Sequence, residues 1–262
     1  MVTAQTTPST ASPAPILAMD AVTVRLGRPP RRVLDAVSLD IFAGEVFGLV
    51  GANGAGKTTL VRAALDMVDI APGGTIALRG RSHRAGGARD GVAYLPERFM
   101  PPPVLSGRAF LGFVARLDGL ILARADLVAL AEEFALDPDA LERRVETYSK
   151  GMVQKLGLMA TFVADPAFVI LDEPMTGLDP GARAALRTAL ARRSRAGTAV
   201  LMNSHLMFDV EQTCRRIAIL DSGRIRFVGT PAGLIRDTGA RDLEAAFVAA
   251  VERPGDIAGA VR

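Results

Sequence analysis

The sequence predicts an α/β protein with a mostly parallel sheet, preceded by antiparallel strands and interrupted by a helical unit. Three observations support this prediction. A glycine-rich loop follows an apolar strand at residues 45–50 and leads into a helical stretch. Strand-like runs and helical stretches then alternate along the chain, as in proteins with a parallel sheet. The run Ala167 to Leu171 is apolar throughout, which is typical of a strand buried on both faces.

Two antiparallel strands are expected before the glycine-rich loop. Ala21–Leu26 and Val33–Ile41 alternate apolar and polar residues around a basic turn at residues 27–32, which we expect to be solvated. Residues 1–15 are rich in Thr, Ser, Ala and Pro and lack the basic and apolar regions of a secretory signal. We therefore expect a disordered N-terminal tail.

The remaining elements follow in order after the loop. Periodicity predicts helices at residues 59–68, 150–164, 180–196, 206–215 and 243–251, and strands at residues 75–78, 92–95, 167–171, 199–202, 217–220 and 224–228. Three prolines at positions 101–103 precede a further helical block. We expect a main domain over residues 16–232, a helical subdomain at about 98–157 and a helical C-terminal tail over 233–262.

Composition excludes several classes of protein. The formal net charge is +3, and no block of Lys and Arg with interleaved aromatic residues is present, so nucleic acid is not an expected partner. Cys214 is the single cysteine, which excludes an internal disulfide, and we expect a buried, inert thiol. Charged residues interrupt the most apolar stretch, Phe110 to Leu136, so no membrane span is expected. His83 lies in a polar, glycine-rich loop and is expected at the surface.

The glycine-rich loop has the residues that bind a nucleoside triphosphate. Residues 51–59 read GANGAGKTT, which matches the pattern G-x-x-x-x-G-K-[ST]. Glycines allow backbone N–H groups to surround phosphate oxygens, a lysine reaches the outer phosphates, and a threonine hydroxyl is a ligand for Mg²⁺. The chain contains only three lysines among its 31 basic residues, so a lysine at this position is a specific choice. The candidate cofactor-binding residues here are Gly51, Asn53, Gly54, Ala55, Gly56, Lys57, Thr58 and Thr59.

Two carboxylates follow the apolar run that ends at Leu171. Parallel strands deliver such groups to the carboxyl edge of the sheet, beside the phosphate loop. Asp172 is a candidate ligand of Mg²⁺, and Glu173 is a candidate base for the water that attacks the terminal phosphate.

Three further segments resemble motifs of one family. Tyr148-Ser149-Lys150-Gly151-Met152 resembles the Leu-Ser-Gly-Gly-Gln signature of ATP-binding cassette (ABC) ATPases. Met175 to Pro180 resembles the D-loop of that family, and Asn203-Ser204-His205 resembles the segment that carries its switch histidine. The similarity extends from about Ile16 to Phe247. It implies a P-loop NTPase of the ABC nucleotide-binding type, with a RecA-like core.

The family resemblance implies a head-to-tail dimer that encloses two ATP and two Mg²⁺. Each ATP would lie between the phosphate loop of one subunit and Ser149 and Gly151 of the other, with Asp179 in the D-loop as a further contact. His205 would contact the terminal phosphate as a catalytic residue beside Glu173. The metal ligands implied are Thr58, Asp172 and the residue in the position of the family's glutamine.

The chain departs from the family pattern at three places. Glu97 replaces the glutamine after the strand at 92–95, and a carboxylate would bind Mg²⁺ more strongly but repel the terminal phosphate. No aromatic residue lies near Leu26, where the family stacks one on adenine. Lys150 and Met152 replace Gly and Gln in the signature.

The function implied is that of an ATP-hydrolysing subunit that drives a separate transmembrane permease. Such a subunit is cytoplasmic and peripheral on the inner face of the membrane. Length and the Glu97 form resemble bacterial exporter-type subunits more than importers. Phe99 and Met100 are candidate contacts with the permease, although plain core packing explains them equally well. The alternatives are a soluble ABC ATPase that clamps a macromolecular complex, and a small-molecule phosphotransferase, against which the signature and D-loop argue.

Overall fold

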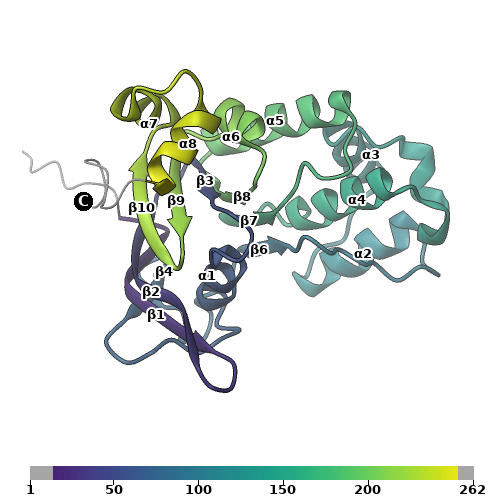
Figure 1. The fold of residues 1–262 in the computed structure, drawn as a ribbon. Coiled ribbons are helices and arrows are strands. Elements are labelled where there is room, and N and C mark those ends of the chain that lie inside the picture. The colour runs from purple at the N-terminus through teal and green to yellow at the C-terminus, as the bar shows by residue number, and fades with distance from the viewer. Residues whose placement is uncertain (1–13, 253–262) are drawn as a thin grey trace, which may run out of the picture.

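The computed structural model describes residues 14–252, which form two β-sheets and a lobe of helices (Figure 1). The larger sheet has six strands in the order β10-β9-β3-β8-β7-β6. Its parallel strands are β3 (Val46–Val50), β6 (Val92–Leu95), β7 (Phe168–Asp172), β8 (Ala199–Asn203) and β9 (Arg216–Asp221), and β10 (Arg224–Gly229) pairs antiparallel with β9. The predicted parallel core is therefore confirmed.

The smaller sheet is antiparallel and contains the strands predicted before the phosphate loop. Its order is β2-β1-β4-β5. The four strands are β1 (Leu17–Leu26), β2 (Arg31–Ile41), β4 (Thr75–Leu78) and β5 (Arg81–Ser82). The short strand β5 lies in a segment predicted as loop, because the polar residues Arg81 and Ser82 give no apolar alternation.

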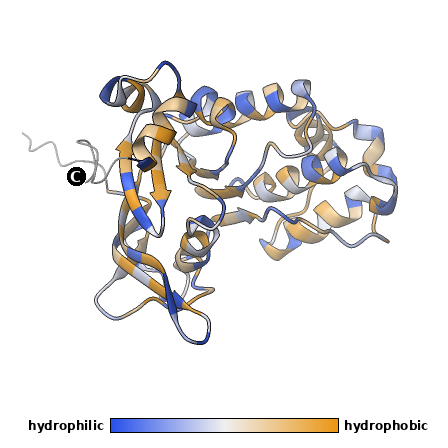
Figure 2. Ribbon diagram, in the orientation of Figure 1, coloured by the Kyte–Doolittle hydropathy of each residue, from blue (hydrophilic) through white to orange (hydrophobic). Residues whose placement is uncertain are grey.

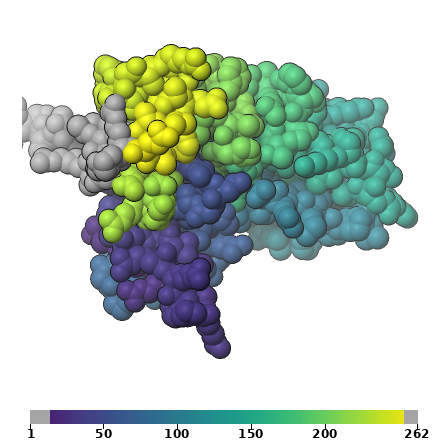
Figure 3. All heavy atoms as spheres, viewed as in Figure 1, coloured from purple at the N-terminus to yellow at the C-terminus, as the bar shows by residue number. Residues whose placement is uncertain are grey.

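The helices divide between the sheets and a separate lobe. Around the sheets lie α1 (Lys57–Ala64), α5 (Pro180–Arg195), α6 (Met207–Thr213), α7 (Pro231–Thr238) and α8 (Leu243–Glu252). The lobe contains α2 (Gly107–Leu117), α3 (Arg124–Glu133), two 3₁₀ turns (Pro138–Glu142 and Val145–Thr147) and α4 (Lys150–Phe162). Figures 1 and 3 show this lobe, in teal, at one end of the molecule.

Two helices differ from the prediction. Helix α1 ends at Ala64 instead of continuing to residue 68, because Asp66 has a φ of 59°, a left-handed conformation that stops an α-helix. Helix α7 was not predicted. It begins with Thr230 as N-cap and Pro231 in its first turn, a start signal that the sequence contains. The tail predicted at the N-terminus lies mostly outside the described residues, as does the chain beyond residue 252.

Alternate residues of the central strands enter two different cores. In β3, Val46 and Val50 belong to the core that also contains residues of α5 and the helical lobe, whereas Phe47 and Leu49 belong to the core of α1 and the smaller sheet. Figure 2 shows hydrophobic residues along the strands of the larger sheet. A strand with both faces buried is apolar throughout, which explains why this sheet was recognisable from the sequence.

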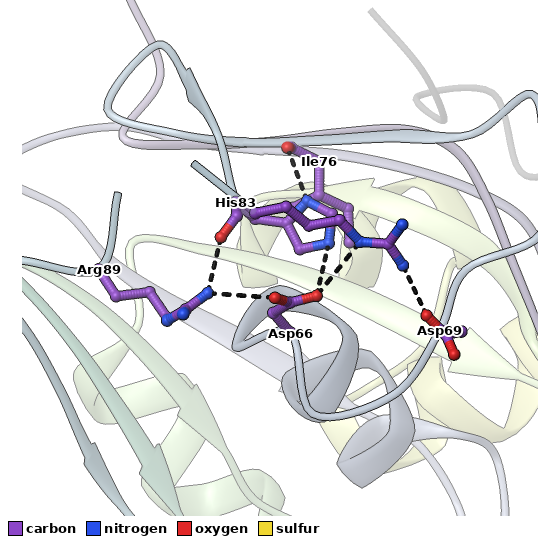
Figure 4. Close-up of polar contacts among 6 residues, drawn as sticks. Asp66, Asp69, Ile76, His83 and Arg89 are labelled. Atoms are coloured by element: carbon purple, nitrogen blue, oxygen red, sulfur yellow. Dashed lines mark hydrogen bonds and ion pairs between the residues drawn. The ribbon is translucent and has the colours of Figure 1, made fainter. Parts of the chain in front are cut away.

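His83 is buried, so its predicted place at the surface is wrong. Only 3% of the residue is exposed, and its Nδ1 lies 3.1 Å from the Ile76 carbonyl oxygen. Its Nε2 lies 3.6 Å from Asp66 Oδ1. Figure 4 shows Asp66 between the His83 ring and the guanidinium group of Arg89, which lies 3.4 Å from Asp66 Oδ2. The prediction failed because the polar residues around His83 do not show that its ring packs between the Ile76 carbonyl oxygen and Asp66.

Two further expectations concern burial and membrane crossing. Cys214 is buried, as predicted, and desolvation raises the pKa of its thiol far above the ordinary value, which favours an inert thiol. Within residues 14–252, no helix combines the length and the apolar character needed to cross a bilayer.

Candidate active site

The phosphate loop joins the buried strand β3 to helix α1. Gly56 is the N-cap of α1 and has a φ of 110°, a backbone conformation that residues other than glycine rarely adopt. A Cβ atom at Gly51 would collide with the carbonyl oxygen of Leu220 in β9. Glycine is therefore required at both ends of the loop. The amino end of α1 faces the loop and favours an anion there.

Lys57 lies across this loop. The residue is 8% exposed, and its Nζ donates hydrogen bonds to the carbonyl oxygens of Gly51 at 2.6 Å and Ala52 at 3.1 Å. Burial lowers the pKa of Lys57, and the nearby carboxylates of Glu173 and Asp172 oppose this change. The ammonium group is thus held by backbone acceptors that a phosphate group can replace.

Three neighbouring strands deliver polar side chains to the same edge of the sheet. Asp172 ends β7, Asn203 ends β8 and Glu97 follows β6. Asn203 Nδ2 donates a short hydrogen bond to Asp172 Oδ1, and Asn203 Oδ1 has no hydrogen-bond partner within the described residues. Burial is the main cause that raises the pKa of Asp172, and the carboxylates of Glu97 and Glu173 add to the effect. A cation at this edge would relieve that concentration of negative charge.

Glu173 and His205 form a pair. Glu173 Oε1 lies 2.7 Å from His205 Nδ1 and accepts a hydrogen bond from the His205 backbone N–H at 3.1 Å. Because a carboxylate only accepts hydrogen bonds, Nδ1 carries the proton and the Nε2 atom is left for another partner. The side chain of Glu173 is 11% exposed and that of His205 is 57% exposed. Glu173 also has a φ of 51°, an uncommon backbone conformation for a non-glycine residue.

These groups surround one pocket of about 390 Å³. Of the predicted site residues, it is lined by Asn53, Gly54, Gly56, Lys57, Thr58, Thr59, Glu97, Asp172, Glu173 and His205. Gly51 and Ala55 also belong to the phosphate loop, but they are buried and do not line the pocket. The arrangement places a lysine and a helix amino end opposite carboxylates and a histidine, which fits a phosphate chain with a divalent cation.

The donors suit Mg²⁺ better than a transition metal. No group of three or more His, Cys, Asp or Glu side chains within residues 14–252 is arranged to hold a metal ion by itself. Mg²⁺ keeps several waters and takes only one or two carboxylates together with phosphate oxygens. Thr58, Asp172 and Glu97 supply a donor set of that kind beside the loop.

The signature and D-loop residues lie apart from this pocket. Ser149, Gly151 and Asp179 are not among the residues that line it. Ser149 is the N-cap of α4, and its Oγ accepts a hydrogen bond from Met152 N at 3.3 Å. Asp179 is the N-cap of α5, and its Oδ1 accepts from Ala182 N at 2.9 Å. A Cβ at Gly151 would lie 2.8 Å from the Gly177 carbonyl oxygen, so the two motifs touch each other.

The family model for ABC transporters matches residues 34–176, which is more than half of the chain. The chain belongs to the ABC transporter family. A solved structure described as an ATP-binding subunit of an ABC transporter superposes with a TM-score of 0.82 at 29% identity, covering 90% of this chain and all of that one. The predicted ABC nucleotide-binding fold is therefore confirmed.

Curated relatives within the ABC family come from diverse organisms. An uncharacterised ABC transporter ATP-binding protein of Synechocystis is 37% identical over 77% of this chain and 58% of its own length. The Nod factor export ATP-binding protein I of Neorhizobium galegae is 32% identical over 86% of this chain and 65% of its own. Human phospholipid-transporting ATPase ABCA7 is 36% identical over 85% of this chain and 11% of its own. The chain thus spans about three fifths of the bacterial relatives.

Three residues that line the pocket were not among the site residues predicted from the sequence. Val33, Thr176 and Asn203 line it together with the predicted residues. Thr176 and Asn203 lie within the D-loop and switch segments, so proximity to those motifs was an available signal. Val33 follows the start of β2, and nothing in its local sequence indicates a pocket. Leu26 is 39% exposed and does not line the pocket.

The candidate permease contacts Phe99 and Met100 have different surroundings. Phe99 meets Phe110 edge to face at 5.8 Å between ring centroids. It lines a groove of about 570 Å³ between β6 and helices α2 and α4. Met100 is 85% exposed and does not line this groove.

Proposed function

We propose that this chain is the ATP-hydrolysing subunit of an ABC transporter, working as a dimer around two ATP to drive a separate permease. One observation carries the proposal. Lys57 and Thr58 of the phosphate loop face Asp172, Glu173 and His205 across one pocket. That arrangement combines a phosphate-binding side with a side able to bind a cation and move a proton.

ATP and Mg²⁺ would be held by residues already close together. The loop backbone from Gly51 to Thr59 and the Lys57 ammonium would bind the phosphates, while Thr58, Asp172 and Glu97 would hold Mg²⁺. The metal supplies charge neutralisation on the phosphate oxygens when bound. Asn203 orients Asp172 through its short hydrogen bond, so the carboxylate is fixed before the cation arrives.

Glu173 would accept the proton of the attacking water. Its contact with His205 Nδ1 at 2.7 Å orients the imidazole, and the other ring nitrogen would then be free to bind a ligand in the pocket that His205 lines. We assign to His205 a contact with the terminal phosphate. Such general-base assistance typically contributes about 10²–10⁴-fold to a rate.

The second half of the site would come from another copy or a homologous subunit. Ser149 and Gly151 lie outside the pocket of their own chain, at the amino end of the 13-residue helix α4. An exposed helix amino end with a serine N-cap is suited to bind a phosphate presented from outside. Asp179 at the amino end of α5 would contribute a contact across the same interface.

The nucleotide base would rest on an aliphatic surface. Val33 is an apolar side chain that lines the pocket beside the loop. At position 26, where the family places an aromatic residue against adenine, this chain has leucine. An aliphatic contact supplies less base selectivity than an aromatic stack. ATP remains the proposed nucleotide because of family membership.

The permease would dock in the groove between β6 and helices α2 and α4, with Phe99 as an apolar contact. This docking would make the chain a cytoplasmic protein that is peripheral on the inner face of the membrane. Relatives named for Nod factor export and phospholipid transport favour an exporter.

We also propose a division of the chain into domains. Residues 16–232 would form the nucleotide-binding domain, with a helical subdomain at about 98–157, and residues 233–262 would form a helical tail.

Co-purification tests the transporter assignment. The tagged full-length chain, isolated from detergent-solubilised membranes, should bring down a polytopic membrane protein in a fixed ratio. A Phe99→Ser variant should reduce recovery of that protein, whereas Met67→Ser, at an exposed site outside the groove, should not. Recovery of only ribosomes or nucleic acid would overturn the transporter assignment.

A further inference from the structure

A second pocket lies in the helical lobe, outside the candidate active site. It encloses about 430 Å³ between helices α2 and α3, and its lining includes Arg108, Arg116, Arg124 and Glu142. Arg108 Nε pairs with Glu142 Oε2 at 3.1 Å. Neither Arg116 nor Arg124 has a side-chain hydrogen bond or ion pair to any of the described residues 14–252. The pocket is therefore lined by two exposed arginines whose guanidinium groups are available to a ligand.

The floor of the pocket is apolar. Ala109 and Gly112 of α2, Leu127 of α3 and Leu122 just before α3 complete its lining. Because Gly112 has no side chain and a Cβ there would meet no atom within 4 Å, the space between the arginines is open. Two guanidinium groups around an open cavity match a phosphate group, which accepts paired hydrogen bonds from arginine.

Large apolar side chains project from the same part of the lobe. Phe113 and Leu117 of α2 are 54% and 72% exposed, and Ile121 in the following loop is 91% exposed. Figure 2 shows α2 as a mixture of hydrophobic and hydrophilic segments at the end of the molecule away from the smaller sheet. Exposed apolar side chains near unpaired arginines give this surface the mixed composition of segments that bind at an anionic membrane interface.

We propose that this pocket binds the phosphate group of an anionic phospholipid at a membrane surface. Arg116 and Arg124 would contact the phosphate, and Phe113, Leu117 and Ile121 would enter the boundary between headgroups and acyl chains. Basic residues combined with exposed apolar residues are the composition of interfacial membrane contacts. The pocket shares no lining residue with the permease groove, whose lining on α2 includes Phe110 and Val114.

Vesicle sedimentation with the full-length chain tests the proposal. Vesicles of phosphatidylglycerol and phosphatidylcholine in equal amounts should bind the chain, and vesicles of phosphatidylcholine alone should bind it far less. The double variant Arg116→Gln/Arg124→Gln should lower the partition coefficient by about 30-fold, because each basic residue near an anionic surface contributes about fivefold. Leu117→Ser should also lower it, whereas Met67→Ser, at another exposed apolar site, should not.

A charge-matched control separates the pocket from overall charge. Arg25→Gln/Arg31→Gln removes the same two charges from exposed positions in β1 and β2, and the hairpin of these strands lies far from α2 in Figure 1. This control should bind the anionic vesicles like the unmodified chain. Equal loss in both double variants would overturn the pocket, leaving only non-specific attraction.

The remaining outcomes distinguish the source of the phosphate. Calorimetric titration with inorganic phosphate measures a soluble ligand directly. Binding of inorganic phosphate that depends on Arg116 and Arg124, without vesicle binding, would overturn the lipid assignment. Unchanged vesicle binding by the Arg116→Gln/Arg124→Gln variant would overturn the site itself. Loss of permease recovery in that variant, with no vesicle binding by the unmodified chain, would assign the surface to a protein partner instead.

Discussion

Lys57 and Asp172 bring opposite charges into one pocket, and burial acts against both. Burial lowers the pKa of Lys57 and raises the pKa of Asp172. Each shift favours the uncharged form, so the ligand-free pocket contains charges that are poorly solvated. Phosphate and Mg²⁺ supply the partners that these two residues lack. The site therefore suits a charged ligand, and the chain without that ligand is less stable than it would be with neutral residues here.

The variant Asp172→Asn tests whether the buried carboxylate lowers the stability of the ligand-free chain. Because the folded-state pKa of Asp172 is raised above its ordinary value of 3.8, protonation of Asp172 stabilises the fold at acid pH, and that stabilisation is lost as pH rises through the raised value. Asparagine is neutral at every pH and can still accept the Asn203 hydrogen bond. At about pH 7.5 without Mg²⁺, well above the ordinary pKa, the variant should melt about 2–4 °C higher, which corresponds to ~1 kcal/mol.

Scanning calorimetry at two pH values measures the effect. Below the ordinary pKa of Asp172 the carboxyl is protonated in both folded and unfolded chains, so the advantage of asparagine should disappear there. An equal gain at both pH values would show that the ionisation of Asp172 is not the cause.

Glu173 and His205 should behave as one unit in catalysis. Glu173→Gln should retain ATP binding and lower the rate of phosphate release by about 10²–10⁴-fold. His205→Ala should also lower the rate, and the double variant should be little worse than Glu173→Gln, because the 2.7 Å contact couples the two residues. Glu211→Gln, at an exposed position on α6, is the matched control. Undiminished release by Glu173→Gln would remove Glu173 as the base.

Glu97 should set the Mg²⁺ requirement. Its carboxylate adds negative charge beside Asp172, so Glu97→Gln should weaken cation binding. Glu97 is exposed, and solvent limits the effect to a rise of up to about fivefold in the Mg²⁺ concentration for half-maximal hydrolysis. Glu132→Gln on α3 is the control. An unchanged Mg²⁺ titration would make the departure from glutamine neutral.

Helix ends and strand ends position nearly all the functional groups. The phosphate loop precedes α1, Ser149 caps α4 and Asp179 caps α5, while Asp172 and Asn203 end neighbouring strands. These positions are the places where backbone N–H groups remain free or where a parallel sheet exposes its carboxyl edge. Small shifts of whole elements therefore move the chemistry.

Asp179 allows the capping role to be separated from an interface role. Asparagine caps helices as well as aspartate, so Asp179→Asn should lose only the exposed ion pair with Lys155, whereas Asp179→Ala should lose the cap as well and be less stable. If Asp179 also acts across a subunit interface, both variants should lower ATP hydrolysis, because the carboxylate is lost in each. Urea unfolding and phosphate release measure the two effects. Full hydrolysis by Asp179→Asn would confine Asp179 to capping.

The parts of the site predictable from sequence are those with local patterns. The phosphate loop, the acidic end of β7 and the buried strands repeat short-range signals of glycine spacing and apolar runs. The contact of Asn203 with Asp172 depends instead on which strands become neighbours, and the burial of His83 depends on its packing against Ile76 and Asp66. Neither contact has a signature in the residues next to each position. The early end of α1 at Ala64 was missed for a related reason, since the left-handed Asp66 belongs to contacts with His83 and Arg89.

At the scale of the whole molecule, each chain has two different halves of the proposed ATP site, and they lie apart from each other. The pocket around Lys57 is formed by the sheets and α1, and the signature lies at the start of α4 in the helical lobe. Figure 3 shows the lobe extending away from the sheets. A second subunit in head-to-tail orientation would bring its own signature to the first pocket, and a two-fold axis would complete both sites at once.

Sedimentation velocity of the Glu173→Gln chain tests this central claim most directly. With ATP and Mg²⁺ the variant should sediment as a dimer, and without nucleotide as a monomer, because hydrolysis no longer releases the bound ATP. Adding Ser149→Arg should abolish the dimer while each monomer still binds ATP, since Ser149 does not line its own pocket. A dimer that persists with Ser149→Arg would contradict the account, and a Glu173→Gln chain that stays monomeric with ATP bound would contradict a dimer of identical subunits.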